Sequence, residues 1–252
     1  MTTTPERATD AVLQTLEGAG LPQAHMKSHG IRLYDQLIAN HPIELPGILA
    51  AVRETSGPIL ELAPGFGLLS EGLSLLGREA STQEVNPPAP QPDGVFGCAV
   101  LGASYITLLE PDSRRTLFRT VNRCLSVGGR FLMTVVNADH RHGPETSGAT
   151  ISQLGEDSFV ITLESRDSMN GARHVSMSHI SFNEHGTYRS SACTSDIAFV
   201  STELIEEELT AEGLRILERR PVKVSVQNTG IKELNLWVCA PSQETAQAED
   251  RS

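Results

Sequence analysis

Four residues of the sequence are suited to hold a nucleotide-like ligand. Gly65 and Gly67 separate the apolar run Ile59–Leu62 from a helical pattern, so they lie in a turn between a strand and a helix. Glycines let such a turn approach a ligand, and the helix points its amides and positive dipole end at the same place. Glu61 precedes the turn, and Glu84 ends the next predicted strand, where a carboxylate can bind a ribose diol. The pattern predicts a ligand at the carboxyl ends of parallel strands.

A catalytic group is less clearly marked. His140 and His142 follow a predicted strand and could act as a general base or line an acceptor pocket. The alternative for each is a loop histidine in solvent. A metal site built from Asp139 and these two histidines would need further carboxylate ligands, so we predict no metal.

The elements that must position these residues follow an alternating helix and strand pattern. Helices are predicted within residues 1–20 and over 31–39, 44–55, 68–76, 112–125 and 202–212. Strands are predicted over residues 59–62, 78–85, 95–101, 130–136 and 214–219, and a closing antiparallel pair over 222–226 and 234–239. The alternation predicts an α/β fold with a mostly parallel sheet.

Residues 139–200 interrupt this alternation. Strand-like stretches at 159–163, 174–182 and 188–200 are joined by Asn170-Gly171 and His185-Gly186, which favour hairpins. We therefore predict a main domain over residues 56–240 with an antiparallel insertion over 145–200. A helical cap over residues 1–55 and a disordered tail over 241–252 complete the expected organisation.

The length and composition exclude several classes of function. The 252 residues fit one α/β domain with an insertion. The net charge of −11 argues against nucleic acid or an anionic membrane as the main partner. No apolar run has membrane-spanning length, no signal-peptide core is present and the four cysteines lack CxxC spacing. We therefore expect a cytoplasmic protein with free thiols.

Three motifs together resemble those of class I S-adenosylmethionine (SAM)-dependent methyltransferases. Residues 61–67, Glu-Leu-Ala-Pro-Gly-Phe-Gly, are similar to the cofactor motif of that family, and Glu84 resembles its acidic ribose position. Residues 125–132, Leu-Ser-Val-Gly-Gly-Arg-Phe-Leu, resemble its turn into the fifth strand. The resemblance implies a Rossmann-like sheet, SAM as cofactor and methyltransferase activity (EC 2.1.1.-). Residues 101–112 also resemble methyltransferases of daptide-type peptide natural product (RiPP) biosynthesis.

The resemblance also implies roles for individual residues. The implied cofactor-binding residues are Tyr34, Glu61, Ala63, Gly65, Gly67, Glu84, Gly102 and Ala103. Tyr34 resembles an aromatic residue that covers the cofactor, and a half-buried helix aromatic is the alternative for it. Tyr105 follows the fourth strand, at a position that in the family faces both the cofactor and the substrate. Together with His140, it is a candidate catalytic residue.

The sequence departs from the family at residues 86–94. The family has a helix and a third strand there, which average about 17 residues together, whereas these nine residues hold four prolines. Nine residues in polyproline geometry reach about 28 Å, and a bypass needs roughly 20 Å. We therefore predict a Rossmann-like methyltransferase sheet that lacks the usual third strand and its helix, with a weakened adenine site. Gly97 in place of an acidic residue and Val127 in place of a proline are smaller departures.

These features predict methyl transfer from SAM to an amine, or a hydroxyl, of a peptide or small-molecule acceptor in secondary metabolism. The insertion is expected to cover the acceptor crevice, and a homodimer is compatible with the family. The alternative is a methyltransferase-like subunit of weak or no activity that binds a partner. A nicotinamide-dependent reductase and a serine hydrolase are excluded, because the third glycine, a Tyr-x-x-x-Lys pair and a G-x-S-x-G motif are missing.

Overall fold

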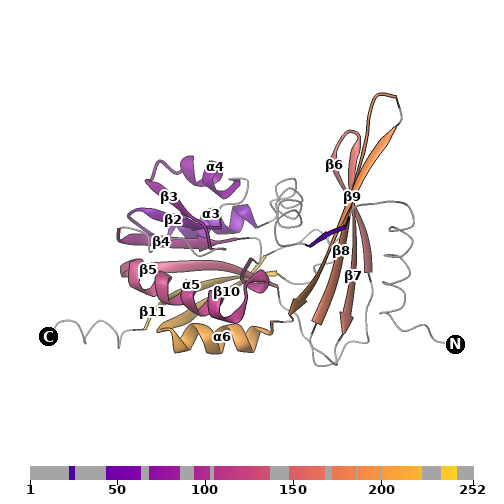
Figure 1. Ribbon diagram of the computed structural model, residues 1–252. Helices are drawn as coiled ribbons and strands as arrows, with labels where there is room; N and C mark the ends of the chain where they lie inside the picture. The colour runs from indigo at the N-terminus through magenta and orange to yellow at the C-terminus, as the bar shows by residue number, and fades with distance from the viewer. Residues whose placement is uncertain are drawn as a thin grey trace. The chain divides into compact units, whose positions relative to one another are not determined.

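The computed structural model describes residues 23–25, 44–63, 68–85, 94–102, 105–136, 148–167, 172–185, 187–198, 200–222 and 234–242. These residues form a six-stranded sheet and a five-stranded sheet, which belong to two compact units of the chain (Figure 1). The unit of the six-stranded sheet comprises residues 42–138, 200–224 and 231–252. The other unit comprises residues 1–41, 139–199 and 225–230.

The six-stranded sheet is mostly parallel and has the order β10-β11-β5-β4-β2-β3. Its strands are β2 (Ile59–Leu62), β3 (Ala80–Gln83), β4 (Phe96–Leu101), β5 (Leu125–Val136), β10 (Leu214–Val222) and β11 (Leu234–Pro241). The strands from β3 to β5 are parallel, and β11 runs antiparallel to both β5 and β10. Every residue of β2 and β4 is buried, as central strands covered on both faces require. The predicted Rossmann-like α/β class is confirmed.

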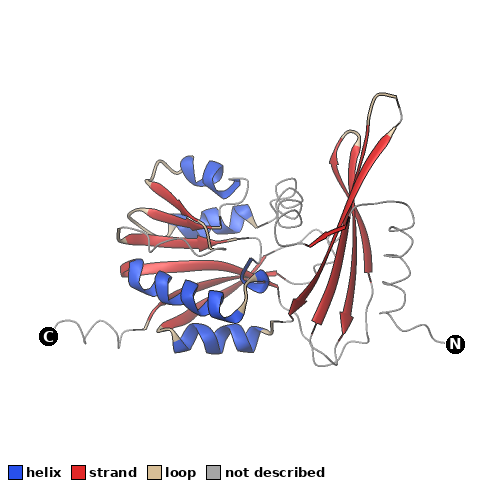
Figure 2. Ribbon diagram, viewed as in Figure 1, coloured by secondary structure: helices blue, strands red, loops and turns tan. Residues whose placement is uncertain are grey.

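Helices accompany this sheet where the sequence predicts them (Figure 2). They are α3 (Leu45–Arg53), α4 (Leu68–Ser74), α5 (Pro111–Cys124) and α6 (Thr202–Ala211), with the short 3-10 helix η2 (Tyr105–Leu108) after β4. The N-terminus of α6 is capped, because Ser201 Oγ accepts a hydrogen bond of 3.1 Å from the Leu204 amide. Among the helices that the structure describes, none is long and apolar enough to span a membrane.

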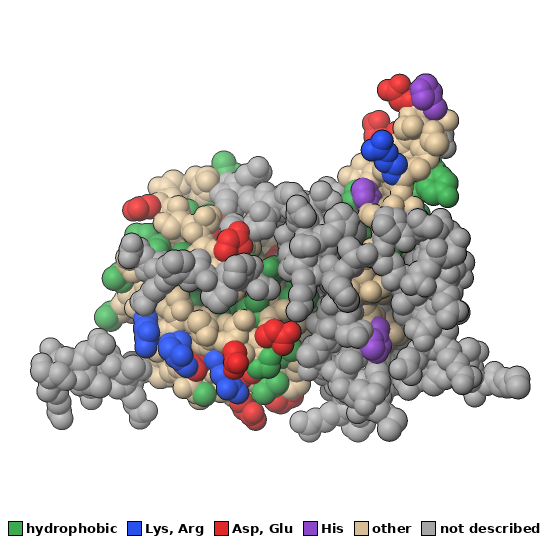
Figure 3. All heavy atoms as spheres, in the orientation of Figure 1, with side chains coloured by type: hydrophobic (Ala, Val, Ile, Leu, Met, Phe, Trp, Pro, Cys, Tyr) green, Lys and Arg blue, Asp and Glu red, His purple; other side chains and the backbone are tan. Residues whose placement is uncertain are grey.

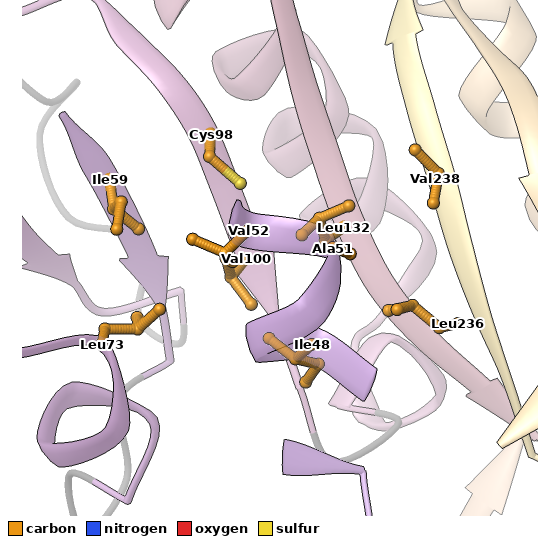
Figure 4. Packing of buried hydrophobic residues seen from close by; sticks show 10 residues of the cluster. All are labelled: Ile48, Ala51, Val52, Ile59, Leu73, Cys98, Val100, Leu132, Leu236 and Val238. Atoms are coloured by element: carbon orange, nitrogen blue, oxygen red, sulfur yellow. The ribbon is translucent and has the colours of Figure 1, made fainter. Parts of the chain in front are cut away.

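One apolar cluster joins α3 to the sheet. Figure 4 shows its ten buried residues, which come from α3, α4 and four strands: Ile48, Ala51, Val52, Ile59, Leu73, Cys98, Val100, Leu132, Leu236 and Val238. The apolar stripe of α3 therefore faces β2, β4, β5 and β11. Burial of each large aliphatic side chain contributes about 1.5–3 kcal/mol, which holds the start of α3 at a fixed place on the sheet.

A close backbone contact explains the glycine at position 97. A Cβ added to Gly97 would lie 1.5 Å from the carbonyl oxygen of Ser56, in the turn that leads into β2. Gly57 has a φ of +79° in this turn. Arg78 holds the turn in place, since its Nε donates to the Gly57 carbonyl at 2.7 Å and its Nη1 to the Val52 carbonyl at 2.9 Å. Any side chain at position 97 would displace this turn, so the acidic residue of the family has no room here.

The five-stranded sheet confirms the predicted antiparallel insertion after the fifth strand of the main sheet. Its order is β1-β9-β8-β7-β6, with β6 (Gly148–Gly155), β7 (Ser158–Asp167), β8 (Ala172–Phe182), β9 (Tyr188–Ala198) and β1 (Gln23–His25). The four longer strands pair antiparallel, and β1 pairs parallel with β9. Strands β6 and β1 were not predicted, because β1 has only three residues and β6 is largely polar and bounded by glycines.

The predicted closing pair over 222–226 and 234–239 is wrong in one respect. Strand β10 begins at Leu214, continues to Val222 and is itself the partner of β11, with Pro221 opposite Asn235. Among the described residues β10 is the edge of the sheet, where a strand tolerates proline, and it continues through Pro221.

Several predictions stay predictions. The helices expected within residues 1–20 and at 31–39 lie outside the described residues, as do positions 86–93 of the expected bypass. Strand β3 is the edge of the sheet in the part of the chain that the structure describes. Helix α3 belongs to the unit of the larger sheet, whereas residues 1–41 belong to the other unit. The expected domain division at residue 55 stays a prediction.

Candidate functional site

Three parallel strands bring the predicted ligand residues to one edge of the larger sheet. Leu62 at the end of β2 is in register with Gln83 of β3 and with Leu101 of β4. Ala63, Glu84 and Gly102 follow these strand ends directly, so the three positions lie next to one another. This edge, at the carboxyl ends of the strands, is where open α/β sheets bind their ligands.

Ala63 adopts a left-handed backbone conformation. Its φ is +50°, and it is the only residue other than glycine with a positive φ in the described part of the chain. The Ala63 amide donates to the Gln83 carbonyl at 2.8 Å, which fixes the turn against the end of β3. A left-handed conformation costs an L-residue about 1–2 kcal/mol. A glycine adopts this conformation without that cost.

Two predicted acidic residues lie in contrasting environments. Glu61 is 1% exposed and lies within β2, in register with Thr82 of β3 and Val100 of β4. Glu84 is exposed directly after β3. The exposed carboxylate of Glu84 at a strand end suits the hydroxyl groups of a ribose, whereas a buried carboxylate such as Glu61 suits a cationic group.

Gly102 lies in a crowded place. A Cβ added to Gly102 would lie 2.7 Å from Glu44 Oε1 and 2.9 Å from Leu69 Cδ1 of α4. Glu44 immediately precedes α3 and is 7% exposed. The sequence reasoning missed Glu44, because an acidic residue before a helix is common and its contact with Gly102 joins distant parts of the chain.

Tyr105, a predicted catalytic residue, lies beside the same edge. It begins η2, is 7% exposed, and its amide donates to the Gly102 carbonyl at 3.1 Å. The structure thus brings Tyr105 together with Gly102, and its catalytic role stays a prediction.

The remaining predicted site residues lie outside the described residues. They are Tyr34, Gly65, Gly67, Ala103, His140 and, for the metal alternative, Asp139 and His142. Within the described ranges, no group of three or more His, Cys, Asp or Glu side chains could hold a metal ion.

The four cysteines are buried free thiols. Burial raises the pKa of Cys98 to about 12 and that of Cys124 to about 11, and it raises the pKa values of Cys193 and Cys239 as well. Thiols with raised pKa values stay protonated near neutral pH, so these cysteines are poor nucleophiles.

Comparison with known proteins places the fold. No protein-family model and no curated protein matches the sequence. A SAM-dependent methyltransferase of Clostridium acetobutylicum has a similar structure, with a TM-score of 0.63 and 14% identity over 83% of this chain and 96% of that one. The CcbJ methyltransferase of Streptomyces caelestis matches with a TM-score of 0.60 and 14% identity over 79% and 89%. The sugar N-methyltransferase KedS8 of Streptoalloteichus sp. matches with a TM-score of 0.59 and 17% identity, over 79% of this chain and 87% of that one.

The larger sheet and its helices therefore have the Rossmann-like fold of SAM-dependent methyltransferases. At these identities the likeness concerns the fold, and the site residues must carry any statement about function. The comparisons do not support the narrower resemblance to daptide-type enzymes, since the matching structures include sugar and glycopeptide methyltransferases.

The described residues fit SAM as the cofactor. Glu84 is exposed directly after β3, Ala63 has a left-handed conformation directly after β2, and the buried Glu61 lies on the strand next to that of Gly102.

Proposed function

We propose that this chain is a SAM-dependent methyltransferase (EC 2.1.1.-) that methylates an amine of a small-molecule or peptide acceptor in natural-product biosynthesis. The observation that carries the proposal is the convergence of Ala63, Glu84 and Gly102 at one edge of three parallel strands, in a sheet of the methyltransferase order.

Each residue at this edge has a defined task in the proposal. Glu84 accepts hydrogen bonds from the ribose hydroxyls, and Glu61 provides negative charge for the amino group of the methionine part. Gly65 and Gly67 are assigned to the turn that admits this part. When bound, SAM supplies an electrophilic methyl group on a sulfonium. The chain contributes by orienting the acceptor in line with that group and by excluding water.

The acceptor is proposed to be an amine rather than a hydroxyl. An amine with a pKa near neutrality carries a lone pair without much help from a base, whereas a hydroxyl must lose a proton. Residues 145–200, assigned to acceptor recognition, hold seven Asp and Glu residues against three Arg and no Lys, which favours a cationic acceptor. The fold is shared with KedS8, a sugar N-methyltransferase.

Calorimetric titration with SAM tests the proposal. We expect a Kd in the micromolar range and a stabilisation of about 2.7 kcal/mol at a hundredfold excess of ligand over Kd. Gly65→Val should abolish this binding and leave the fold intact, because a branched side chain fills the space that the turn leaves for the ligand. If neither SAM nor S-adenosylhomocysteine binds at millimolar concentration, the enzyme hypothesis is wrong and a subunit that binds a partner remains.

The acceptor class needs a second assay. Transfer of a labelled methyl group should be observed to amine-bearing acceptors, such as amino sugars and peptides with a free N-terminus, and should be weaker to the matching hydroxyl compounds. Faster transfer to hydroxyl acceptors would show that the assignment of an amine is wrong.

A further inference from the structure

The residue that carries a further inference is Glu44, a buried carboxylate at the edge of the sheet. Its side chain makes no capping hydrogen bond to α3, although it immediately precedes that helix. Instead Glu44 Oε1 lies 2.7 Å from the position that a Cβ of Gly102 would occupy. Only a glycine at position 102 lets the carboxylate come this close to β4.

Glu44 lies on the same face of the sheet as Glu61. Glu61 is in register with Val100, and Gly102 follows Val100 by two residues, so all three positions share one face. Ile59 and Val100 on this face pack against Ile48 and Val52 of α3 (Figure 4). One strand spacing and a rise of two residues separate the Cα atoms of Glu61 and Gly102, which is about 8 Å.

Two buried carboxylates on one face impose a strong electrostatic preference. Glu44 is 7% exposed and Glu61 is 1% exposed, so water screens neither charge effectively. A carboxylate that is ionised in the interior carries a desolvation cost of several kcal/mol, which a positive group of a ligand offsets. An ammonium group lowers this energy, because it has three N–H donors on one positive charge and can bind two carboxylates together.

We propose that Glu44 is a second carboxylate for the amino group of the methionine part of SAM, which it binds together with Glu61 next to Gly102. The inference rests on the proposed function and adds a binding residue from α3 to the sheet edge. It gives Glu44, whose carboxylate lies close to where a Cβ of residue 102 would be, a task in recognising the ligand.

Glu44→Gln separates recognition of the amino group from a structural role. The probes are S-adenosylhomocysteine and its deaminated analogue, which keeps the carboxylate, the thioether and the adenosine. In calorimetry, Glu44→Gln should lower the affinity for S-adenosylhomocysteine by at least about tenfold. Its affinity for the deaminated analogue should stay within about twofold of that of the unaltered chain. Glu54→Gln is the matched control, because Glu54 directly follows α3 with its side chain 57% exposed, and it should change neither affinity.

Gly102→Ala provides a second variant should Glu44→Gln fail to fold. The new Cβ displaces the Glu44 carboxylate and keeps its charge, so the preference for S-adenosylhomocysteine over the deaminated analogue should fall again. Unchanged affinity of Glu44→Gln for S-adenosylhomocysteine, or equal losses for both probes, overturns the inference. Failure of the unaltered chain to bind S-adenosylhomocysteine overturns the proposed function instead, and the inference with it.

Discussion

At the scale of single residues, the site is defined by backbone conformation as much as by side-chain chemistry. Ala63 occupies a left-handed conformation that glycine adopts without strain. Glu84 lies where the sequence places a ribose-binding carboxylate, and its position after β3 follows from a short polar strand. Residue types and spacing were sufficient to place Ala63 and Glu84 directly after strands, because this placement depends on neighbours within a few positions, and their roles toward a cofactor stay predictions.

Ala63→Gly should stabilise the protein. Relief of the left-handed conformation contributes about 1–2 kcal/mol, and the greater freedom of glycine in the unfolded chain costs about 0.5–1 kcal/mol, so a net gain of about 0.5–1 kcal/mol is expected. Urea denaturation measures this difference.

The control for this prediction is Ala50→Gly, the same change at an exposed position within α3. It should destabilise the protein by about 1 kcal/mol, because glycine is a poor helix former. A loss of stability in both variants would show that residue 63 is not strained.

At the scale of elements, local sequence patterns were enough to predict most strands of the larger sheet. They did not predict the contacts between residues that are far apart in the chain. The apolar runs of β2 and β4 and the stripe of α3 predict their elements directly. Glu44 and Gly102 are far apart in the chain, and so are Ser56 and Gly97, so no local pattern reveals either contact. The edge pairing of β10 was missed for another reason, since Pro221 is usually a strand breaker.

Gly97→Ala tests the contact between β4 and the turn before β2. A Cβ at position 97 would lie 1.5 Å from the Ser56 carbonyl oxygen, so backbone must move. We expect a loss of about 3 kcal/mol, which thermal or urea unfolding will detect.

Gly47→Ala is the matched control, because a Cβ at Gly47 meets nothing within 4 Å and the residue lies within α3. This variant should gain about 1 kcal/mol from helix propensity. Similar stabilities of the two variants would contradict the predicted close approach at Gly97.

A buried ion pair joins α5 to α6. Arg114 Nε lies 2.6 Å from Glu208 Oε2 and Nη2 lies 2.8 Å from Oε1, while Nη1 donates to the Leu109 carbonyl at 2.7 Å. Arg114→Met leaves the Glu208 charge buried without its partner and should destabilise the protein by about 3–5 kcal/mol in urea denaturation.

Arg119→Met is the control for the buried pair. Arg119 of α5 pairs at 2.8 Å with Glu212, which directly follows α6, but the Arg119 side chain is 51% exposed. Its loss should cost at most about 1 kcal/mol. Combining Arg114→Met with Glu208→Leu should recover most of the stability, and equal effects of the two single changes would argue against a special cost of burial.

At the scale of the whole molecule, exposed ion pairs and buried neutral thiols differ in how they respond to pH. Charged side chains of both signs gather over α5 and α6 on the face shown in Figure 3. Cys98 and Cys124 are buried with pKa values raised by loss of hydration. The two arrangements contribute differently to the pH dependence of stability. Exposed ion pairs change stability little when they titrate, whereas buried groups with shifted pKa values change it strongly.

Stability should fall as the pH rises above about 9. The unfolded chain ionises its thiols near a pKa of 9.0, whereas folded Cys98 has a pKa of about 12, so the unfolded state releases protons first. The contribution of Cys98 is present below pH 9 and is lost toward pH 12, by up to about 1.4 kcal/mol per pH unit.

Urea denaturation between pH 8 and about 10.5 measures this loss for the unaltered chain and for Cys98→Ala. Lysine and tyrosine titrate in both proteins, so the difference between them reports Cys98. A difference that does not change with pH would show that the Cys98 thiol ionises equally well in the folded state.

The edge strand β10 has a consequence for how chains meet. Open sheet edges can pair with strands of other molecules and so seed aggregates. Pro221 removes one backbone donor from this edge, and Glu218, Arg219 and Arg220 place charges beside it. A strand from another chain would lose a hydrogen bond and bury charge there. The edge of β10 therefore disfavours pairing with a strand of a second copy.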